Sequence, residues 1–391
     1  MLNRYLFLIF CPFLWLVSCK NAEETKVSDP STEVFQYPVG KVDTTSAAFL
    51  SWREEIGHHF QKLHRFTNFN GCVLVARQGV VIYEGAFGVK DLKLKEPLAL
   101  NSVFQIASVS KTFTAMATLL LVEDGRLDLA QPMEDFFDGF PYPGVTVGDL
   151  LSHRSGLPNY LSVTEKVWGH QGVLRTNKDL LNFLIEQQPP ILALPNRTFC
   201  YNNTNYALLA LIIEQVSGMP YEEFMQRRIF DPLDMKETYI YSARNKQLPG
   251  KNITTGYLRK NHPDDMVPVD GIVGDKNIYS TVGDLLKWER ANAHSYLFKQ
   301  ATLDSSVVGR SNERYGSRNY GYGWRMMENS EKGKVVYHNG WWHGYTATFY
   351  RNPADETVII ILSNIYNRNT YRIQPVWDIL YGKGHHQDLE E

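Results

Sequence analysis

A serine and a lysine stand three residues apart at the start of an apolar run of the chain. Apolar residues then recur at spacings of four, three and four, on one helical face: Val109, Phe113, Met116 and Leu120. This spacing predicts a helix that begins near Ser108, and Gly125 predicts its end. Because Lys111 lies on the same helical side as Ser108, its amine could take the hydroxyl proton and make Ser108 a nucleophile.

Simpler explanations exist for each residue of this pair. A serine at a helix N-terminus often caps free backbone amides. A lysine in an apolar helix can extend its amine to solvent along its own methylene chain. The pair therefore needs support from other parts of the sequence before catalysis is the better explanation.

Two later stretches contain polar residues that could complete a site with Ser108 and Lys111. Tyr201 and Asn203 precede an apolar helical pattern, where asparagine is also a common turn and cap residue. His338 follows a run of strand-forming residues, and we expect it at the end of that strand. Gly340, two residues on, would let the backbone approach a ligand closely. Trp341 and Trp342 come next and would either line a substrate cleft or pack against the sheet edge.

The composition excludes several classes of protein. The chain has 391 residues and a formal net charge of −2, so nothing in its charge favours nucleic acid as a partner. Its 43% apolar and 13% aromatic residues suffice for a large core and argue against disorder. Because no metal-ligand cluster, phosphate-binding loop or dinucleotide fingerprint is present, we expect no cofactor. We also expect a monomer.

The first residues have the features of an export signal. Residues 5–17 form an apolar run that is short for a membrane span and follows a positive start. The run ends in a small residue before Cys19, which resembles a bacterial lipobox and implies lipid attachment at Cys19. A signal peptide cut nearby and an uncleaved anchor are the alternatives. The lipobox implies a lipid-anchored protein of the bacterial periplasm or outer membrane.

The mature chain then divides into a tether and one domain. Residues 1–19 are expected to be the lipoprotein signal peptide, 20–45 a polar flexible tether, and 46–385 a single domain. Cys72 lies in an apolar run and Cys200 next to Tyr201. An oxidising compartment would permit a disulfide between these two cysteines, but we expect both to be free.

The order of predicted elements indicates an α+β fold. The first part contains a helix and a β-hairpin, the middle is mostly helical, and the end returns to strands and a last helix. We therefore expect one antiparallel sheet that joins the two ends of the chain, flanked by helices, with a mostly helical lobe inserted. The expected helices are 47–63, 108–124, 145–156, 178–187, 205–216, 221–229, 280–293 and 374–380. The expected strands are 71–76, 80–83, 335–338, 345–350 and 357–362.

Taken together, the motifs resemble those of the serine hydrolases of the class C β-lactamase and penicillin-binding-protein family. The order of the motifs Ser-x-x-Lys, Tyr-x-Asn and His-x-Gly is similar to that of the family. The flanking sequence segments 71–76, 150–157, 201–209, 279–285 and 320–324 are similar as well. The similarity extends over about residues 45–370 and implies the β-lactamase/transpeptidase-like fold.

The resemblance also implies a role for each motif residue. Ser108 would form an acyl intermediate, with Lys111 and Tyr201 as a shared proton relay in which either could be the base. Asn203 would hold Lys111 and the substrate, and the backbone N–H groups of Ser108 and Trp341 would form the oxyanion hole beside Gly340.

His338 marks a departure from the β-lactamases, which usually have Lys-Thr-Gly at this position. A histidine carries the positive charge only in part near neutral pH, so we expect it to attract a β-lactam carboxylate less than lysine does. His-x-Gly resembles DD-carboxypeptidases, D-aminopeptidases and esterases of the family. His153 and Arg154 are expected to fix a loop near the site.

Three functions follow from the resemblance. The first is an exported serine hydrolase that acts on a peptide of the D-alanyl or D-amino-acid type, with cell-wall peptide as one candidate, or on an ester. The second is a β-lactamase, and the third is a penicillin sensor without turnover. The complete set of motifs disfavours the sensor. Residues 158–195 and 240–278 are loop-rich and would decide the substrate.

Overall fold

The computed structural model describes residues 39–246, 252–259, 262–313, 318–328 and 333–382. The expected signal peptide, tether residues 20–38 and the last expected domain residues lie outside these ranges. Within the described ranges, no helix combines the length and apolar character that a membrane crossing requires.

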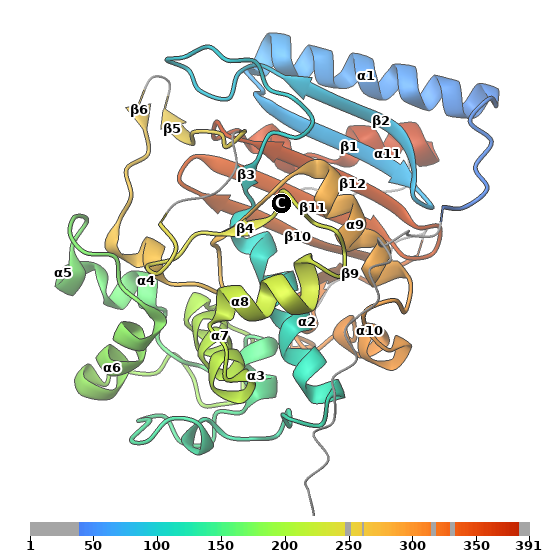
Figure 1. Ribbon diagram of the computed structural model, residues 1–391. Coiled ribbons are helices and arrows are strands. Elements are labelled where there is room, and N and C mark those ends of the chain that lie inside the picture. Colours follow the sequence, from blue (N-terminus) through green and yellow to red (C-terminus); the bar gives the residue numbers. More distant parts are fainter. Residues whose placement is uncertain (1–38, 247–251, 260–261, 314–317, 329–332, 383–391) are drawn as a thin grey trace, which may run out of the picture. The chain divides into compact units, whose positions relative to one another are not determined.

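A seven-stranded antiparallel sheet joins the two ends of the chain, as the sequence predicts. In Figure 1 the blue strands β1 and β2 lie beside the red strand β12. The register of β1 and β12 begins with Gly71 opposite Ser363. The strand order is β2-β1-β12-β11-β10-β9-β8, and the strands are β1 (Gly71–Arg77), β2 (Val80–Phe87), β8 (Arg318–Tyr320), β9 (Arg325–Met327), β10 (Val335–Trp342), β11 (Tyr345–Asn352) and β12 (Thr357–Ser363).

The sheet is apolar on both faces because helices cover both. Along β12, Ile359 and Ile361 belong to one hydrophobic cluster, while Val358, Ile360 and Leu362 belong to another. This alternation follows from the two-residue period of a strand. The α+β prediction is therefore confirmed in its central feature, a sheet between two helical layers.

The first and last helices cover one face of the sheet. α1 (Ala47–Thr67) and α11 (Gln374–Tyr381) contact each other and share the cluster with Ile359 and Ile361. Ser46 caps α1, and its side chain accepts the N–H of Phe49. The other face carries the larger cluster, which includes the residues of the helical lobe.

The helical lobe lies between β2 and β8 in the sequence. Its longer helices are α2 (Ser110–Glu123), α6 (Asn177–Gln187), α7 (Asn203–Ser217), α9 (Val282–Ala293) and α10 (Gln300–Ser306). The shorter ones are α3 (Val147–Leu151), α4 (Tyr160–Val163), α5 (Glu165–Trp168) and α8 (Tyr221–Met225). Short strands β3 (Phe104–Gln105), β7 (Ile278–Ser280) and β4 (Tyr239–Ile240) form a second small sheet, and β5 (Tyr257–Arg259) pairs with β6 (His262–Pro263).

Several predicted boundaries are wrong for local reasons. The helix expected over 145–156 ends at Leu151, because His153 adopts a left-handed conformation (φ 57°) that no α-helix continues through. The helix expected over 221–229 changes at Gln226 into one π-helical turn, Gln226–Phe230. The strand expected to end at His338 continues to Trp342, so His338 lies inside β10. Strands β8 and β9 and helix α10 were not predicted.

Candidate active site

Ser108 lies in a 3-10 turn, Ala107–Val109, that leads directly into α2. Its neighbour Ala107 has a positive φ of 47°, which is uncommon for a residue with a side chain. Ser108 is half-buried, whereas Lys111 is fully buried. The Nζ of Lys111 lies 3.1 Å from the Ser108 Oγ. The two residues that the sequence paired are thus in hydrogen-bond contact.

Two further oxygens hold the amine of Lys111. Nζ donates to the Asn203 Oδ1 at 2.8 Å and to the backbone carbonyl of Asp275 at 2.8 Å. Asn203 is placed there because Asn202 caps α7, its side chain accepting the N–H of Thr204 at 3.0 Å. Three neutral oxygen atoms therefore surround the buried amine, one for each N–H of its protonated form.

Ser110 is the other serine near Lys111, but it has a structural role. It is fully buried, and its Oγ accepts the N–H of Ile278 at 3.1 Å. This contact ties α2 to the strand β7. Ser108 is the more accessible of the two hydroxyls and the one that contacts the amine.

Tyr201 reaches the same place from the loop before α7. The Lys111 Nζ lies 5.1 Å from the centre of the Tyr201 ring, and the Tyr201 and His338 rings are 6.1 Å apart. On its other side the ring packs against His153, at 4.4 Å between centroids. His153 is fully buried and its Nδ1 accepts the N–H of Asn202 at 3.2 Å. His153 thus supports the Tyr201 loop, as expected.

Arg154, next to His153, fixes the neighbouring loops. Its guanidinium contacts Glu313 at 2.8 Å and donates to the side chain of Asn196 at 2.9 Å. Both contacts join segments distant in the sequence, which agrees with the loop-fixing role expected for Arg154.

His338 is fully buried in β10 and faces the site with Gly340. Its Nδ1 donates to the carbonyl of Asn339 at 2.8 Å, so its Nε2 is an acceptor, 3.3 Å from the Tyr320 hydroxyl. Burial, together with the charges of Arg325 and Lys111, holds the pKa of His338 well below its usual value. This environment disfavours the charged form of His338, in the direction expected for a residue that attracts a β-lactam carboxylate less than lysine does.

Gly340 allows β10 to lie directly against the turn that carries Ser108. A Cβ at Gly340 would be 3.0 Å from the Ser108 backbone nitrogen and 2.3 Å from the carbonyl oxygen of Ile106. A side chain would therefore displace this turn. Trp341 follows with 55% of its surface exposed, whereas the Trp342 indole donates to Asp270 at 2.7 Å and is half-buried.

The sequence did not reveal three members of this site. Asp275 contributes a backbone carbonyl, which leaves no trace in residue type. Arg325 lies with its guanidinium 5.1 Å from the Tyr201 ring, and Tyr320 contacts His338. Tyr320 belongs to the stretch at 320–324 and Arg325 directly follows it. This stretch supported the family resemblance, but none of its residues was assigned a role.

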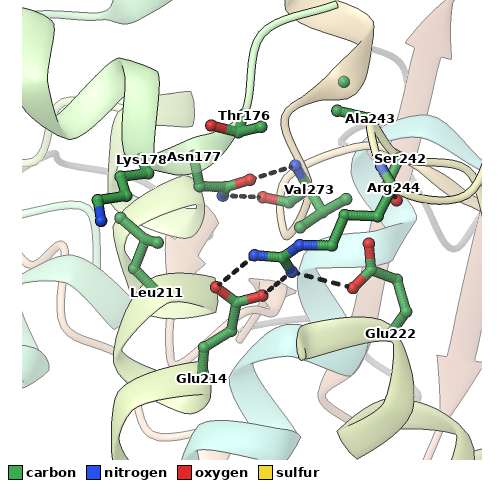
Figure 2. Close-up of a pocket in the computed structure, with 11 residues that line it drawn as sticks. Thr176, Asn177, Lys178, Leu211, Glu214, Glu222, Ser242, Ala243, Arg244 and Val273 are labelled. Carbon is green, nitrogen blue, oxygen red and sulfur yellow. Dashed lines mark hydrogen bonds and ion pairs between the residues drawn. The ribbon is translucent and has the colours of Figure 1, made fainter. Parts of the chain in front are cut away.

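A small cavity elsewhere in the helical lobe has a different character. Figure 2 shows Arg244 between Glu214 and Glu222, beside Asn177. The side-chain amide of Asn177 donates to the backbone carbonyl of Val273 and accepts the backbone N–H of the same residue. The cavity has a volume of about 20 Å³, enough for one water molecule but not for a substrate. None of the predicted site residues lines it, so this ion cluster is structural.

The described residues contain no group of three or more His, Cys, Asp and Glu side chains arranged to hold a metal ion. Cys72 is buried and Cys200 half-buried, and both are free thiols, as expected.

An antiparallel sheet with a helical lobe that brings Ser108, Lys111 and Tyr201 together defines the β-lactamase/transpeptidase-like class of fold. The model of the Beta-lactamase family matches residues 64–380, and the chain belongs to this family.

Similar proteins and similar solved structures support this family assignment. Penicillin-binding protein 4* of Bacillus subtilis is 33% identical over 346 residues, which cover 85% of this chain and 76% of that protein. The octameric penicillin-binding protein homologue from Pyrococcus abyssi is 27% identical, with a TM-score of 0.73 over 85% of this chain and 77% of that one. The penicillin binding protein from Bacillus halodurans has the same fold, with a TM-score of 0.73 at 24% identity over 83% of this chain and 99% of that one.

Proposed function

We propose that the protein is an exported serine hydrolase that acts through an acyl-Ser108 intermediate on a peptide of the D-alanyl or D-amino-acid type, or on an ester. The observation that carries the proposal is the buried amine of Lys111, 3.1 Å from the Ser108 Oγ and held otherwise by neutral oxygens. Such an amine can exchange a proton with the hydroxyl without leaving an unpaired carboxylate behind.

The reaction begins when Lys111 and Tyr201 take the Ser108 proton as the oxygen attacks the substrate carbonyl. The backbone N–H groups of Ser108 and Trp341 would stabilise the negative oxygen of the tetrahedral intermediate. The leaving group departs with the proton that the relay returns. Lys111 and Tyr201 then take a proton from water as its oxygen attacks the carbonyl of the acyl-Ser108 ester, and they return this proton to the Ser108 oxygen as the second product leaves with a new carboxyl group.

Two features favour a peptide that ends in a carboxylate. The ladder between β9 and β10 covers only Val335–Tyr337, while β10 continues to Trp342. This strand edge has no neighbouring strand within the described ranges, so an extended peptide could add to it as a further strand. Arg325, beside Tyr201, provides a permanent positive charge for a carboxylate.

The relatives named as penicillin-binding proteins support cell-wall peptide as the substrate. A β-lactamase remains the alternative, because β-lactams resemble the acylating peptide. Fast hydrolysis of nitrocefin that does not change across neutral pH would favour that alternative.

We also propose that Cys19 is lipidated and anchors the enzyme in the periplasm or outer membrane. The support is the lipobox-like sequence alone, since residues 1–38 lie outside the described ranges. Cys19→Ser should abolish metabolic labelling with a fatty acid, and labelling that persists in this variant would contradict the anchor.

The test of the activity is a substrate panel with the wild type and Ser108→Ala. D-alanine release from a D-alanyl-D-alanine peptide, hydrolysis of a p-nitrophenyl ester and hydrolysis of nitrocefin are measured in parallel. We expect turnover of the peptide or the ester that Ser108→Ala abolishes. Turnover that is equal in both proteins, or absent for all three substrates, would contradict the proposal.

A further inference from the structure

The turn that joins β10 to β11 carries a histidine in an uncommon conformation. His343 and Gly344 form a two-residue hairpin turn, and both have positive φ, 46° and 76°. Asparagine, aspartate and glycine are the residues that such a turn favours, because a larger side chain is strained there. A histidine held at this position suggests a use for its ring.

Both ring nitrogens of His343 face carboxylates. Nε2 lies 2.7 Å from the Asp270 Oδ2, and Nδ1 lies 3.3 Å from the Asp264 Oδ2. Tyr257 of the adjoining strand β5 directs its hydroxyl to Asp91 instead. Burial disfavours the charged ring, but the hydrogen bond and charge of Asp270, with Asp264, outweigh it and raise the pKa of His343. Only the doubly protonated ring can donate to both partners.

Asp270 connects this turn to a second residue of β10. Its side chain is almost fully buried, and its Oδ1 accepts the indole N–H of Trp342 at 2.7 Å. The backbone N–H of Val267 also donates to its carboxylate, at 2.6 Å. Segment 264–277 is therefore fastened to the end of β10 through one buried carboxylate.

The other end of segment 264–277 reaches the catalytic amine. The Asn277 amide donates to the carbonyl of Asp270 and, at 2.9 Å, to that of Ile272, which stiffens the segment internally. The carbonyl of Asp275 accepts the Lys111 Nζ at 2.8 Å. A continuous chain of contacts thus runs from the His343 ring to Lys111.

We propose that His343 is a positioning residue: with Asp270 and Asp264 it forms a proton-dependent clasp that fixes segment 264–277, and with it the carbonyl that holds Lys111. The part of this inference that concerns acylation rests on the proposed function. The clasp is complete when the ring is protonated and loosens as pH rises through the pKa of His343. Lys111 then loses its fixed acceptor, and Ser108 is activated less.

The test compares the wild type with His343→Asn, because asparagine suits the turn but cannot bridge the two carboxylates. His170→Asn is the matched control, since His170 lies 3.6 Å from Glu165 in an exposed pair. Two readouts are followed against pH in the full-length protein. One is the rate of Ser108 acylation by a p-nitrophenyl ester, and the other is the ¹³Cε resonance of Lys111, assigned with Lys111→Arg.

We expect acylation by the wild type and His170→Asn to fall about tenfold through the titration of His343, within the hundredfold that a 1 Å misplacement can cost. The Lys111 resonance should show an inflection at the same pH, and both inflections should be absent in His343→Asn. Equal profiles in the wild type and His343→Asn, or a Lys111 resonance that ignores the His343 titration, would overturn the clasp.

The two readouts also separate the clasp from the proposed function. If none of the three substrates of the panel is turned over but the Lys111 resonance follows His343, the clasp stands and the hydrolase proposal fails. If the ester is turned over and the resonance does not follow His343, the hydrolase proposal stands and the clasp fails.

Discussion

Two buried lysines share Asp275, but the protein surrounds their amines differently. Lys111 donates to the backbone carbonyl of Asp275, the Ser108 hydroxyl and the Asn203 side-chain oxygen, and all three of these acceptors are neutral. Lys276 uses the carboxylate of Asp275, at 3.4 Å, with the Tyr160 hydroxyl and the Val269 carbonyl. Both lysines are nearly or fully removed from solvent.

The charge of the surrounding acceptors distinguishes the amine of Lys111, which can exchange a proton, from that of Lys276, which stabilises the fold. Removing a proton from Lys276 would leave the buried carboxylate of Asp275 without its cation, which is costly. Removing a proton from Lys111 leaves only neutral oxygens around it. The same residue type therefore serves chemistry at one position and cohesion of the fold at the next.

The largest expected difference between the lysines is in activity. Lys111→Met should lower acylation of Ser108 by about 10²–10⁴, the usual contribution of a general base. Lys276→Met should leave Ser108 reactive, because the Asp275 carbonyl that holds Lys111 is part of the backbone. Rates of p-nitrophenyl ester hydrolysis measure both. If both variants lost activity equally while remaining folded, the distinction would fail.

The reverse order is expected for stability. Lys276→Met leaves a buried carboxylate unpaired and should lower the free energy of unfolding by about 3–5 kcal/mol. Adding Asp275→Asn to Lys276→Met should restore part of this loss, because the uncompensated charge is then removed. Urea unfolding of the single and double variants measures the effect, and a double variant no more stable than Lys276→Met would contradict it.

Two buried histidines beside Lys111 should make stability depend on pH. Burial, with the nearby charges of Lys111 and Arg325, holds the pKa values of His153 and His338 well below the usual 6.5. Below about pH 6.5 the unfolded chain therefore binds more protons than the folded one. For each histidine, the free energy of unfolding then decreases by about 1.4 kcal/mol for every unit by which the pH is lowered.

This contribution is fully present above the unfolded pKa and is lost as the pH falls. His343 has the opposite sign, because its pKa is raised. His338→Gln should reduce the acid slope, and the exposed His170→Gln should keep it. Thermal unfolding between about pH 5 and 7 tests this, and an unchanged slope in His338→Gln would show that His338 is protonated in the folded state.

The smallest expected effect concerns the second serine. Ser110→Ala leaves the Ile278 N–H without its acceptor and should cost about 1–3 kcal/mol of stability, while acylation continues. Unfolding and ester hydrolysis of the same preparation measure both quantities. Loss of acylation in folded Ser110→Ala would transfer the nucleophile from Ser108 to Ser110.

The sequence predicted the parts of the site that depend on residue type and helical spacing. The Ser108 and Lys111 side chains are in contact because three residues make almost one helical turn. The strands from the two ends of the chain pair in one sheet because β1 and β12 are strongly apolar. The Asp275 contact was not predictable, since any residue can offer a carbonyl. His338 was placed at a strand end because the strand pattern weakens at Asn339 and Gly340, yet pairing with β11 continues to Trp342.

The most direct test of the account is the site of covalent labelling. The wild type, Ser108→Ala, Ser110→Ala and Lys111→Met are treated with a fluorophosphonate, and the modified residue is mapped by mass spectrometry. The account predicts a label on Ser108 in the wild type and in Ser110→Ala, none in Ser108→Ala, and greatly slowed labelling in Lys111→Met. A label that persists in Ser108→Ala, or that forms at the wild-type rate in Lys111→Met, would contradict it.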